Sequence, residues 1–165
     1  MPSSTRRALE RLDALYALGG GPGANRPGGS EAEQQAFELA AVWIEEADLE
    51  VETDADGNVI GRLAGSRPEL PEVWTGSHLD SVPAGGKFDG ALGVVAGLEA
   101  VERAGRDERT LGVVAFRDEE RGCVGSRAFA ERGRLPGRHV ELHVEQGPVL
   151  ELLDLPLGTP VEISR

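Results

Sequence analysis

Histidine and carboxylate side chains gather at four places in this sequence, each beside an apolar stretch. His78 ends one stretch, and Asp89 stands just before another. Glu119 and Glu120 follow a third, and His143 lies in a fourth. Imidazole and carboxylate donors without a thiolate suit zinc and related divalent cations. Adjacent glutamates at a strand end can divide the work of hydrolysis, because one can ligate a metal while the other moves a proton from water.

Each of these residues taken alone has a plainer explanation. A single histidine such as His78 is more often an ordinary turn residue, and Asp89 is typical of a helix N-cap. The acids at 118–120 are typical of a solvated turn, and His143 of the surface of a half-buried strand, as we expect for His139. Only the four places together favour a metal site.

Two neighbouring residues bear on this interpretation. Asp80 lies two residues after His78, so its carboxylate can hydrogen-bond the second imidazole nitrogen and fix the tautomer of a metal ligand. Cys123 is the single cysteine, which excludes an internal disulfide. A nucleophilic role for Cys123 is disfavoured because no histidine lies near it in the sequence.

The elements that must position these residues alternate between helices and strands. Ser30 and Glu33 form a capping-box pattern in which both side chains satisfy backbone amides at a helix start. A turn at 56–58 joins two short strands. This order predicts an α/β fold, a layered mixed sheet flanked by helices. We expect helices at 6–18, 31–47, 90–104 and 126–131, and strands at 49–53, 59–63, 73–78, 111–116 and 139–145.

Composition narrows the class of protein. The chain has 165 residues, 39% of them hydrophobic, which suits one packed domain or one domain and the start of another. A formal net charge of −12 disfavours nucleic acid as a partner. The N-terminus lacks an apolar signal-peptide region, and no apolar run reaches about 18 residues. We therefore expect a soluble cytoplasmic protein without a membrane partner.

Three segments resemble the M20 metallopeptidase superfamily, in the branch of N-carbamoyl-L-amino-acid hydrolases, β-ureidopropionases and allantoate amidohydrolases. They are GSHLDSVPAGGKFDGALGVVAGLEA (76–100), VVAFRDEERGCVGSRA (113–128) and LHVEQGPVLE (142–151), with a weaker likeness at 45–63. KFDGALGV stands where other M20 enzymes carry a DMKGG-like segment. The resemblance implies that the fold is the N-terminal half of an M20-type zinc-hydrolase catalytic domain.

The resemblance also implies a pair of divalent metal ions, Zn²⁺ in the first place and Mn²⁺ or Co²⁺ as alternatives. His78 and His143 would ligate the same ion, Asp89 would bridge both ions, and Glu120 would ligate the second ion. Glu119 would be the general base, removing a proton from a metal-bridging water that attacks the substrate.

Two further residues take roles by the same resemblance. Asp80 would support His78 in catalysis, and Gln146 would lie close to the substrate. The implied substrate is a small ureido molecule, an N-carbamoyl-L-amino acid or allantoate, cleaved at a C–N bond other than a peptide bond.

The chain departs from this branch in two respects. Only 22 residues separate Glu120 from His143, where the branch often carries a longer insertion. The enzymes of the branch are also more than twice as long, with a dimerisation domain and a second catalytic half that supplies a last histidine ligand. This chain has three histidines, and His139 lies in the wrong segment. We therefore expect residues 1–156 to be the N-terminal part of the catalytic domain and 157–165 the start of a connection to an absent dimerisation domain.

Three functions stay open from the sequence. The first is a metal-dependent ureido hydrolase present as its N-terminal part, from a family that is typically homodimeric. The second is a non-catalytic remnant that at most binds metal. The third is an M20 aminoacylase or dipeptidase, which would prefer N-acetyl or peptide substrates.

Overall fold

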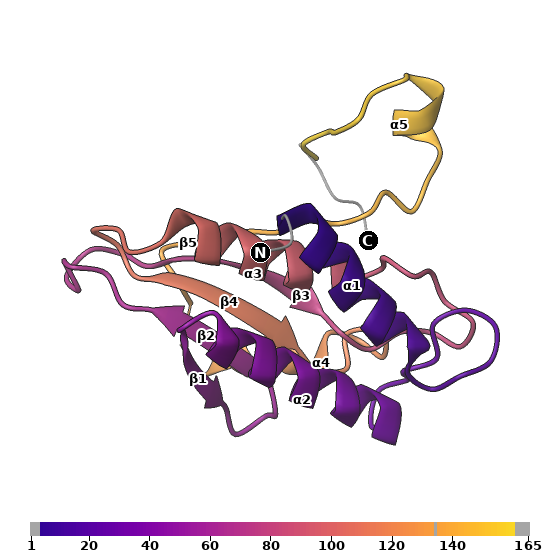
Figure 1. The fold of residues 1–165 in the computed structure, drawn as a ribbon, viewed down its shortest axis with the longest axis horizontal. Coiled ribbons are helices and arrows are strands. Elements are labelled where there is room, and N and C mark those ends of the chain that lie inside the picture. The colour runs from indigo at the N-terminus through magenta and orange to yellow at the C-terminus, as the bar shows by residue number, and fades with distance from the viewer. Residues whose placement is uncertain (1–3, 134, 161–165) are drawn as a thin grey trace.

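A mixed five-stranded sheet forms the centre of the computed structural model, which describes residues 4–133 and 135–160 (Figure 1). The spatial order is β1-β2-β4-β3-β5. β1 pairs with β2 and β2 with β4 in antiparallel fashion, whereas β3 runs parallel to both β4 and β5. The strands are β1 (Glu50–Thr53), β2 (Val59–Leu63), β3 (Val73–His78), β4 (Leu111–Phe116) and β5 (Arg138–Val140).

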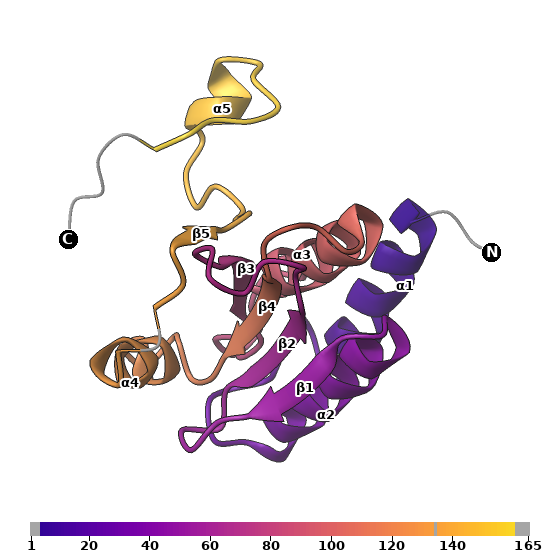
Figure 2. The same cartoon turned by 90° about the vertical axis from the view of Figure 1, so that its left-hand side faces the viewer.

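Helices cover both faces of this sheet, as Figure 2 shows. The first three helices lie on one face, and α4 lies on the other. α3 is the crossover between the parallel strands β3 and β4, so both strands end at the same edge of the sheet. The helices are α1 (Ser4–Ala17), α2 (Glu31–Glu46), α3 (Ala91–Ala104), α4 (Val124–Glu131) and α5 (Val149–Leu152).

Two apolar clusters hold these layers together. The larger one joins the first three helices to the sheet, with residues such as Phe37, Val95 and Val113 almost fully buried. The smaller one, on the α4 face, consists of Ile60, Trp74, Val114 and Phe129, with Phe116 packed against it. The α/β fold with a mixed sheet between helices is thus confirmed.

A buried ion cluster fastens α1 to α3. Glu99 is 6% exposed and accepts hydrogen bonds from the guanidinium groups of Arg7 and Arg11 and from the hydroxyl of Ser4. Arg11 is also buried and stacks over the ring of Trp43 in α2. The three helices on this face are therefore joined by charge as well as by apolar packing.

The start of α2 differs from the capping box that the sequence predicts. Ser30 is the N-cap and accepts from the Glu33 amide at 3.1 Å, as expected. The Glu33 carboxylate is fully buried and, instead of returning to Ser30, accepts from the Gly29 amide, the Arg117 guanidinium and the Asp118 amide. Glu33 therefore ties the start of α2 to the segment that follows β4.

The β1–β2 turn also reaches that segment. Asn58, expected only as a turn residue, is fully buried. Its side-chain oxygen accepts from the Arg117 amide, and its side-chain nitrogen donates to Asp54 and to the Gly125 carbonyl. The loop between β4 and α4 is thus held from two sides.

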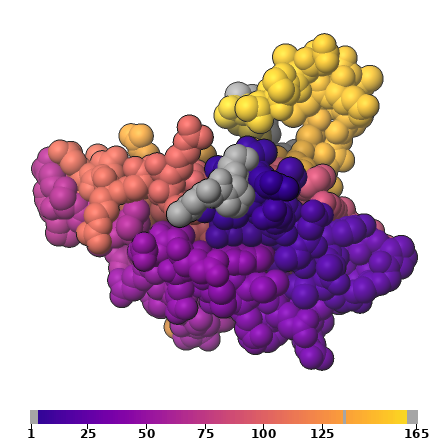
Figure 3. All heavy atoms as spheres, viewed as in Figure 1, coloured from indigo at the N-terminus to yellow at the C-terminus, as the bar shows by residue number. Residues whose placement is uncertain are grey.

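The predicted strand at 139–145 is wrong beyond Val140. The observed strand β5 ends there, and residues 141–145 have no regular structure. Alternating hydrophobicity gave the expectation, yet Val140 and Leu142 are exposed rather than packed. The short helix α5 was not foreseen, and Figures 1 and 3 show its segment standing off from the body of the molecule. Of the expected connection at 157–165, residues 161–165 lie outside the described residues.

Among the described helices, the longest spans 16 residues, and none combines the length and the hydrophobicity needed to cross a bilayer.

Candidate metal centre

His78 is the last residue of β3 and is 3% exposed. Its Nδ1 lies 3.2 Å from Asp80 Oδ1, the contact that the sequence predicts. Burial acts to lower the pKa of His78, but the hydrogen bond and the charge of Asp80 outweigh it and raise that pKa. With Nδ1 engaged, Nε2 is the nitrogen left to face the open side of the site.

Asp80 has a second task that the sequence did not reveal. Its two carboxylate oxygens accept from the backbone amides of Glu119 and Glu120, each at 3.0 Å. Burial acts to raise the pKa of Asp80, yet the hydrogen bonds from His78 and the two amides hold it below its ordinary value. One buried carboxylate thus fixes the end of β3 against the turn after β4.

The predicted ligands form two groups that share His78. In the first, donor atoms of His78, Asp89 and His143 all lie within 4.8 Å of one another. In the second, the same limit holds for His78, Glu119 and Glu120. The first group contains the three residues that the resemblance assigns to one ion.

Two carboxylate oxygens inside this cluster lack a hydrogen-bond partner among the described residues. They are Asp89 Oδ1 and Glu120 Oε1, both shielded from solvent. Asp89 Oδ1 instead faces His143 Nε2 at 3.3 Å. Burial, followed by the charge of Asp89, raises the pKa of Glu120. Buried carboxylate oxygens without donors are expected where a cation binds, so the donor set fits a divalent metal ion.

Asp89 does not cap the helix that follows it. The N-cap of α3 is Gly90, and no side chain caps that helix end. Gly90 has a φ of 61°, and a Cβ built there would meet ring atoms of His78 at 2.5–2.6 Å. The backbone at Gly90 therefore packs directly against the imidazole, which explains why a glycine follows Asp89.

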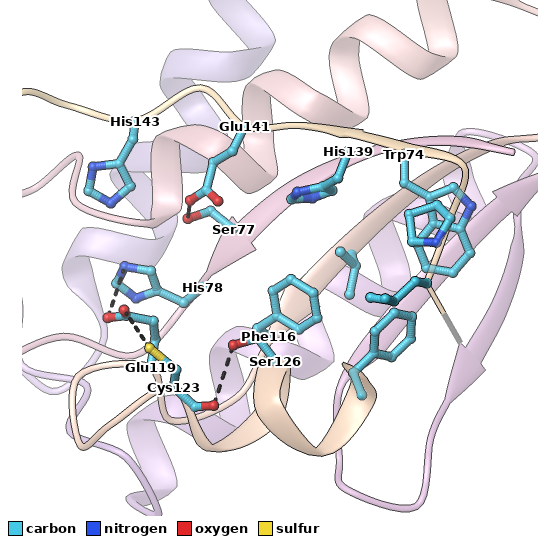
Figure 4. Close-up of a pocket in the computed structure, with 14 residues that line it drawn as sticks. Trp74, Ser77, His78, Phe116, Glu119, Cys123, Ser126, His139, Glu141 and His143 are labelled. Carbon is cyan, nitrogen blue, oxygen red and sulfur yellow. Dashed lines mark hydrogen bonds and ion pairs between the residues drawn. The ribbon is translucent and has the colours of Figure 1, made fainter. Parts of the chain in front are cut away.

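The two glutamates occupy a strained turn. Asp118 and Cys123, on either side of them, both have left-handed backbone conformations, with φ of 54° and 57°. Glu119 points toward His78, with its Oε2 3.8 Å from His78 Nε2. The Cys123 thiol donates to Glu119 Oε1 at 3.4 Å (Figure 4). The acids at 118–120 are thus not a solvated charged turn, since Asp118 is buried and the two glutamates are half-buried.

Gln146, predicted near the substrate, is exposed and does not line the cavity beside His78.

Two residues of that cavity, Ser77 and Glu141, were not singled out from the sequence. Ser77 donates to Glu141 Oε1 at 2.5 Å, which fastens the segment before His143 to β3 (Figure 4). The alternation of Glu141 with His143 in the sequence could have indicated that Glu141 lies on the same side as His143.

The chain is similar to several known proteins. The description "Peptidase family M28" matches residues 58–145, more than half of the chain. N-carbamoyl-L-amino acid amidohydrolase of Geobacillus stearothermophilus is 37% identical over 205 residues, covering 96% of this chain and 50% of the relative. Allantoate deiminase 1 of Glycine max is 32% identical over 180 residues, covering 78% of this chain and 37% of the relative.

A solved structure shows the same fold. A hydantoinase/carbamoylase family amidase from Burkholderia vietnamiensis superposes with a TM-score of 0.76 and 28% identity, covering 90% of this chain and 47% of that one. The matched part of the chain spans 37–50% of the length of these proteins. The 205-residue match is longer than the whole chain of 165 residues, so the Geobacillus relative carries internal stretches that this chain lacks.

The mixed sheet, with histidine and carboxylate side chains converging at the ends of its parallel strands, defines the class of M28/M20-type hydrolases. The chain belongs to this class, in the branch of the hydantoinase/carbamoylase amidases. The resemblance drawn from the sequence is thereby confirmed, although the matching description carries the family name M28 rather than M20.

Proposed function

We propose that this chain carries the first-half ligand set of a binuclear, metal-dependent amidohydrolase that cleaves a C–N bond of an N-carbamoyl-L-amino acid or of allantoate. The observation that carries the proposal is the pair of ligand groups sharing His78, with Asp89 Oδ1 and Glu120 Oε1 left without hydrogen bonds. The names of the relatives, which act on carbamoyl and allantoate substrates, support the substrate class.

His78, Asp89 and His143 would hold one ion, and Glu120, with Asp89 as a bridging carboxylate, would help to hold the second. Bound divalent ions supply Lewis-acid chemistry, since they polarise a carbonyl group and acidify water. Zinc is the first choice for this donor set, and manganese and cobalt also suit it.

Glu119 is the residue that we assign to proton transfer. Its carboxylate lines the cavity and is 38% exposed, so it can reach a water molecule next to a substrate. It would take a proton from that water while the water oxygen forms a bond to the ureido carbon. The C–N bond then breaks, and Glu119 returns the proton to the leaving nitrogen. Asp80 would keep His78 and the Glu119 backbone in place throughout.

The test is an assay of the chain with Zn²⁺, Mn²⁺ or Co²⁺ on N-carbamoyl-L-amino acids and allantoate. Turnover should fall by ~10²–10⁴-fold in Glu119→Gln, because a general acid–base contributes that much. Elemental analysis should show that Glu119→Gln still binds metal. Turnover that survives in this variant would remove Glu119 from the reaction.

A second candidate, a non-catalytic remnant that binds metal, is favoured by one observation. The resemblance implies one further histidine ligand, and His139, the third histidine, belongs to neither ligand group. Its ring centroid instead lies 6.2 Å from that of Phe116. Two results together would establish this candidate. The chain would bind metal that His78→Ala and Asp89→Ala no longer bind, and it would show no turnover with any metal while a relative assayed beside it is active. Faster cleavage of N-acetyl or peptide substrates than of ureido substrates would instead indicate an aminoacylase or dipeptidase.

A further inference from the structure

One cavity of about 430 Å³ joins the candidate metal centre to an aromatic wall. His78, Glu119 and His143 line one end. Figure 4 shows that Phe116 lies between this end and the opposite one, where Trp74 stands. The cavity therefore has a polar end that carries the chemistry and an apolar end beside it.

The strand register places the two ends on the same face of the sheet. Trp74 and His78 are four residues apart on β3, so their side chains project to the same side. His78 is the register partner of Phe116 on β4, and Trp74 is the partner of His139 on β5. All four residues line the cavity, which thus runs along β3 from its first residues to its end.

The apolar end is held rigidly by its own packing. Phe129 of α4 is 2% exposed, and its ring centroid lies 5.7 Å from those of both Trp74 and Phe116. A Cβ at Gly112 would meet the Trp74 ring at 2.7 Å, so the indole rests directly on the backbone of β4. Trp74 Nε1 already donates to Glu72 at 2.6 Å. The rings of Trp74, Phe116 and Phe129 consequently present aromatic surface without an unused donor, and the polar side chains beside them are those of Ser126 and His139.

We propose that this apolar end binds the side chain of the substrate, so that the substrate class is N-carbamoyl amino acids with large aliphatic or aromatic side chains. The inference rests on the proposed function, which places the ureido carbon beside Glu119. It also separates the two substrates named above. Allantoate has no hydrocarbon side chain to place against the rings of Trp74, Phe116 and Phe129, and its second ureido group would lose water there, which is costly where hydrogen bonds are not replaced.

The first experiment compares kcat/KM for N-carbamoyl-L-leucine, N-carbamoylglycine and allantoate. The leucine derivative should be preferred over the other two by roughly 10–100-fold, since it alone places apolar side-chain surface against the wall. Equal kcat/KM for the leucine and glycine derivatives would overturn the inference while leaving the proposed function intact.

Two variants localise the effect. Ser126→Leu adds bulk from α4 into the middle of the cavity, which its half-buried side chain lines. It should remove the preference for leucine, whereas Ala130→Leu, an exposed position on the same helix, should keep it. Leu135→Asp is a second variant at the cavity rim, where the side chain is 67% exposed and tolerates change. It should also lower kcat/KM for the leucine derivative, and an unchanged preference in both Ser126→Leu and Leu135→Asp would overturn the inference.

A binding measurement keeps the inference testable if no substrate is turned over. The chain has two tryptophans, so Trp43→Phe leaves Trp74 as the single fluorescent indole. N-carbamoyl-L-leucine should change Trp74 emission saturably in the metal-loaded protein, and N-carbamoylglycine should not. Such a change, absent in Ser126→Leu, supports the pocket even if the proposed hydrolysis fails. No saturable change with the leucine derivative would overturn the pocket.

Discussion

At the level of single residues, Asp80 connects the two halves of the candidate centre. Replacement by Asn puts an NH₂ group where one carboxylate oxygen now accepts a hydrogen bond from His78 Nδ1 or from a glutamate amide. We expect Asp80→Asn to weaken Zn²⁺ binding by roughly 10–100-fold, as loss of a supporting hydrogen bond to a ligand does. Isothermal titration of the metal-free protein measures this change.

Asp56→Asn is the matched control for Asp80→Asn. Asp56 makes its ion pair with Arg132 on α4's C-terminal side, away from His78, and Zn²⁺ affinity should stay as in the parent. Equal affinities in all three proteins would show that Asp80 does not support the ligands.

Gly90 sets the position of the His78 ring from the opposite side. Gly90→Ala would drive a methyl group into the imidazole and also strain a left-handed backbone. Gly105, the C-cap of the same helix, has a similar φ of 66° but open space around it. Gly105→Ala should lose about 1–3 kcal/mol of unfolding free energy from backbone strain alone, and Gly90→Ala should lose more because its methyl group also meets the His78 ring.

Metal affinity separates the two alanine variants. We expect it to fall in Gly90→Ala and to remain unchanged in Gly105→Ala, as titration with Zn²⁺ would show. A normal affinity in Gly90→Ala would mean that the ring can move away without cost to the site.

At the level of elements, the contact between α1 and α3 depends on the ionised form of Glu99. Burial acts to raise the pKa of Glu99, but hydrogen bonds from Arg7 and Ser4, with the charges of Arg7 and Arg11, hold it below its ordinary value of 4.5. A lowered carboxyl pKa stabilises the folded state fully above the ordinary value. That stability is lost as the pH falls through the lowered pKa of the folded protein.

Glu99→Gln should therefore destabilise the chain at pH 7 by about 3 kcal/mol, since it leaves buried Arg11 without its partner. The loss should shrink as the pH falls below 4.5, the ordinary carboxyl pKa at which the unfolded parent begins to take up a proton, and should be smallest once the pH has passed the lowered pKa of the folded protein. Urea unfolding between pH 7 and pH 3 measures both effects. Glu10→Gln, in an exposed pair with Arg6, should cost no more than ~0.5 kcal/mol, and a similar cost for Glu99→Gln would contradict this account.

The elements were largely predictable because their patterns were local. The strands at 59–63, 73–78 and 111–116 have the expected bounds, since each is an apolar run between turn residues. The strand at 139–145 was overestimated because alternation describes a possible strand but not its partner. In the structure β3 pairs with three residues of β5 only.

The candidate site was predictable in its residue types but not in its long-range contacts. His78, Asp89, Glu119, Glu120 and His143 do come together, whereas Gln146 remains exposed. No periodicity could indicate that Asp80 accepts from two amides about forty positions away. The capping pattern of Glu33 and the turn pattern of Asn58 likewise give no indication that both side chains accept hydrogen bonds from backbone amides of the segment after β4.

At the scale of the whole molecule, the segment after His143 lies apart from the rest of the fold, so we expect it to be removable by proteolysis. Glu145 and Glu151 are exposed, and the α5 segment stands off from the rest (Figures 1 and 3). A glutamate-specific protease should cut first at these two residues, and mass spectrometry of the fragments would show it. Earlier cleavage within α2, whose glutamates lie in a packed helix, would contradict this expectation.

Cleavage after Glu145 keeps His78, Asp89, Glu120 and His143 in one fragment. That fragment should bind Zn²⁺ with the affinity of the intact chain. A large loss of affinity would mean that the segment around α5 contributes to the centre, which its exposed leucines do not suggest.

The left-handed residues on either side of the two glutamates have a consequence for the evolution of this chain. Glycine at position 118 or 123 would relax the turn, and strain of this kind persists only where the surroundings enforce it. Because the buried Asp118 carboxylate also pairs with Arg121, a selection for heat resistance alone should collect glycine at position 123 rather than at position 118. Such variants would gain stability, but the side chains of Glu119 and Glu120 would be held less firmly in position. At this turn, selection for thermal stability and selection for activity therefore favour different residues.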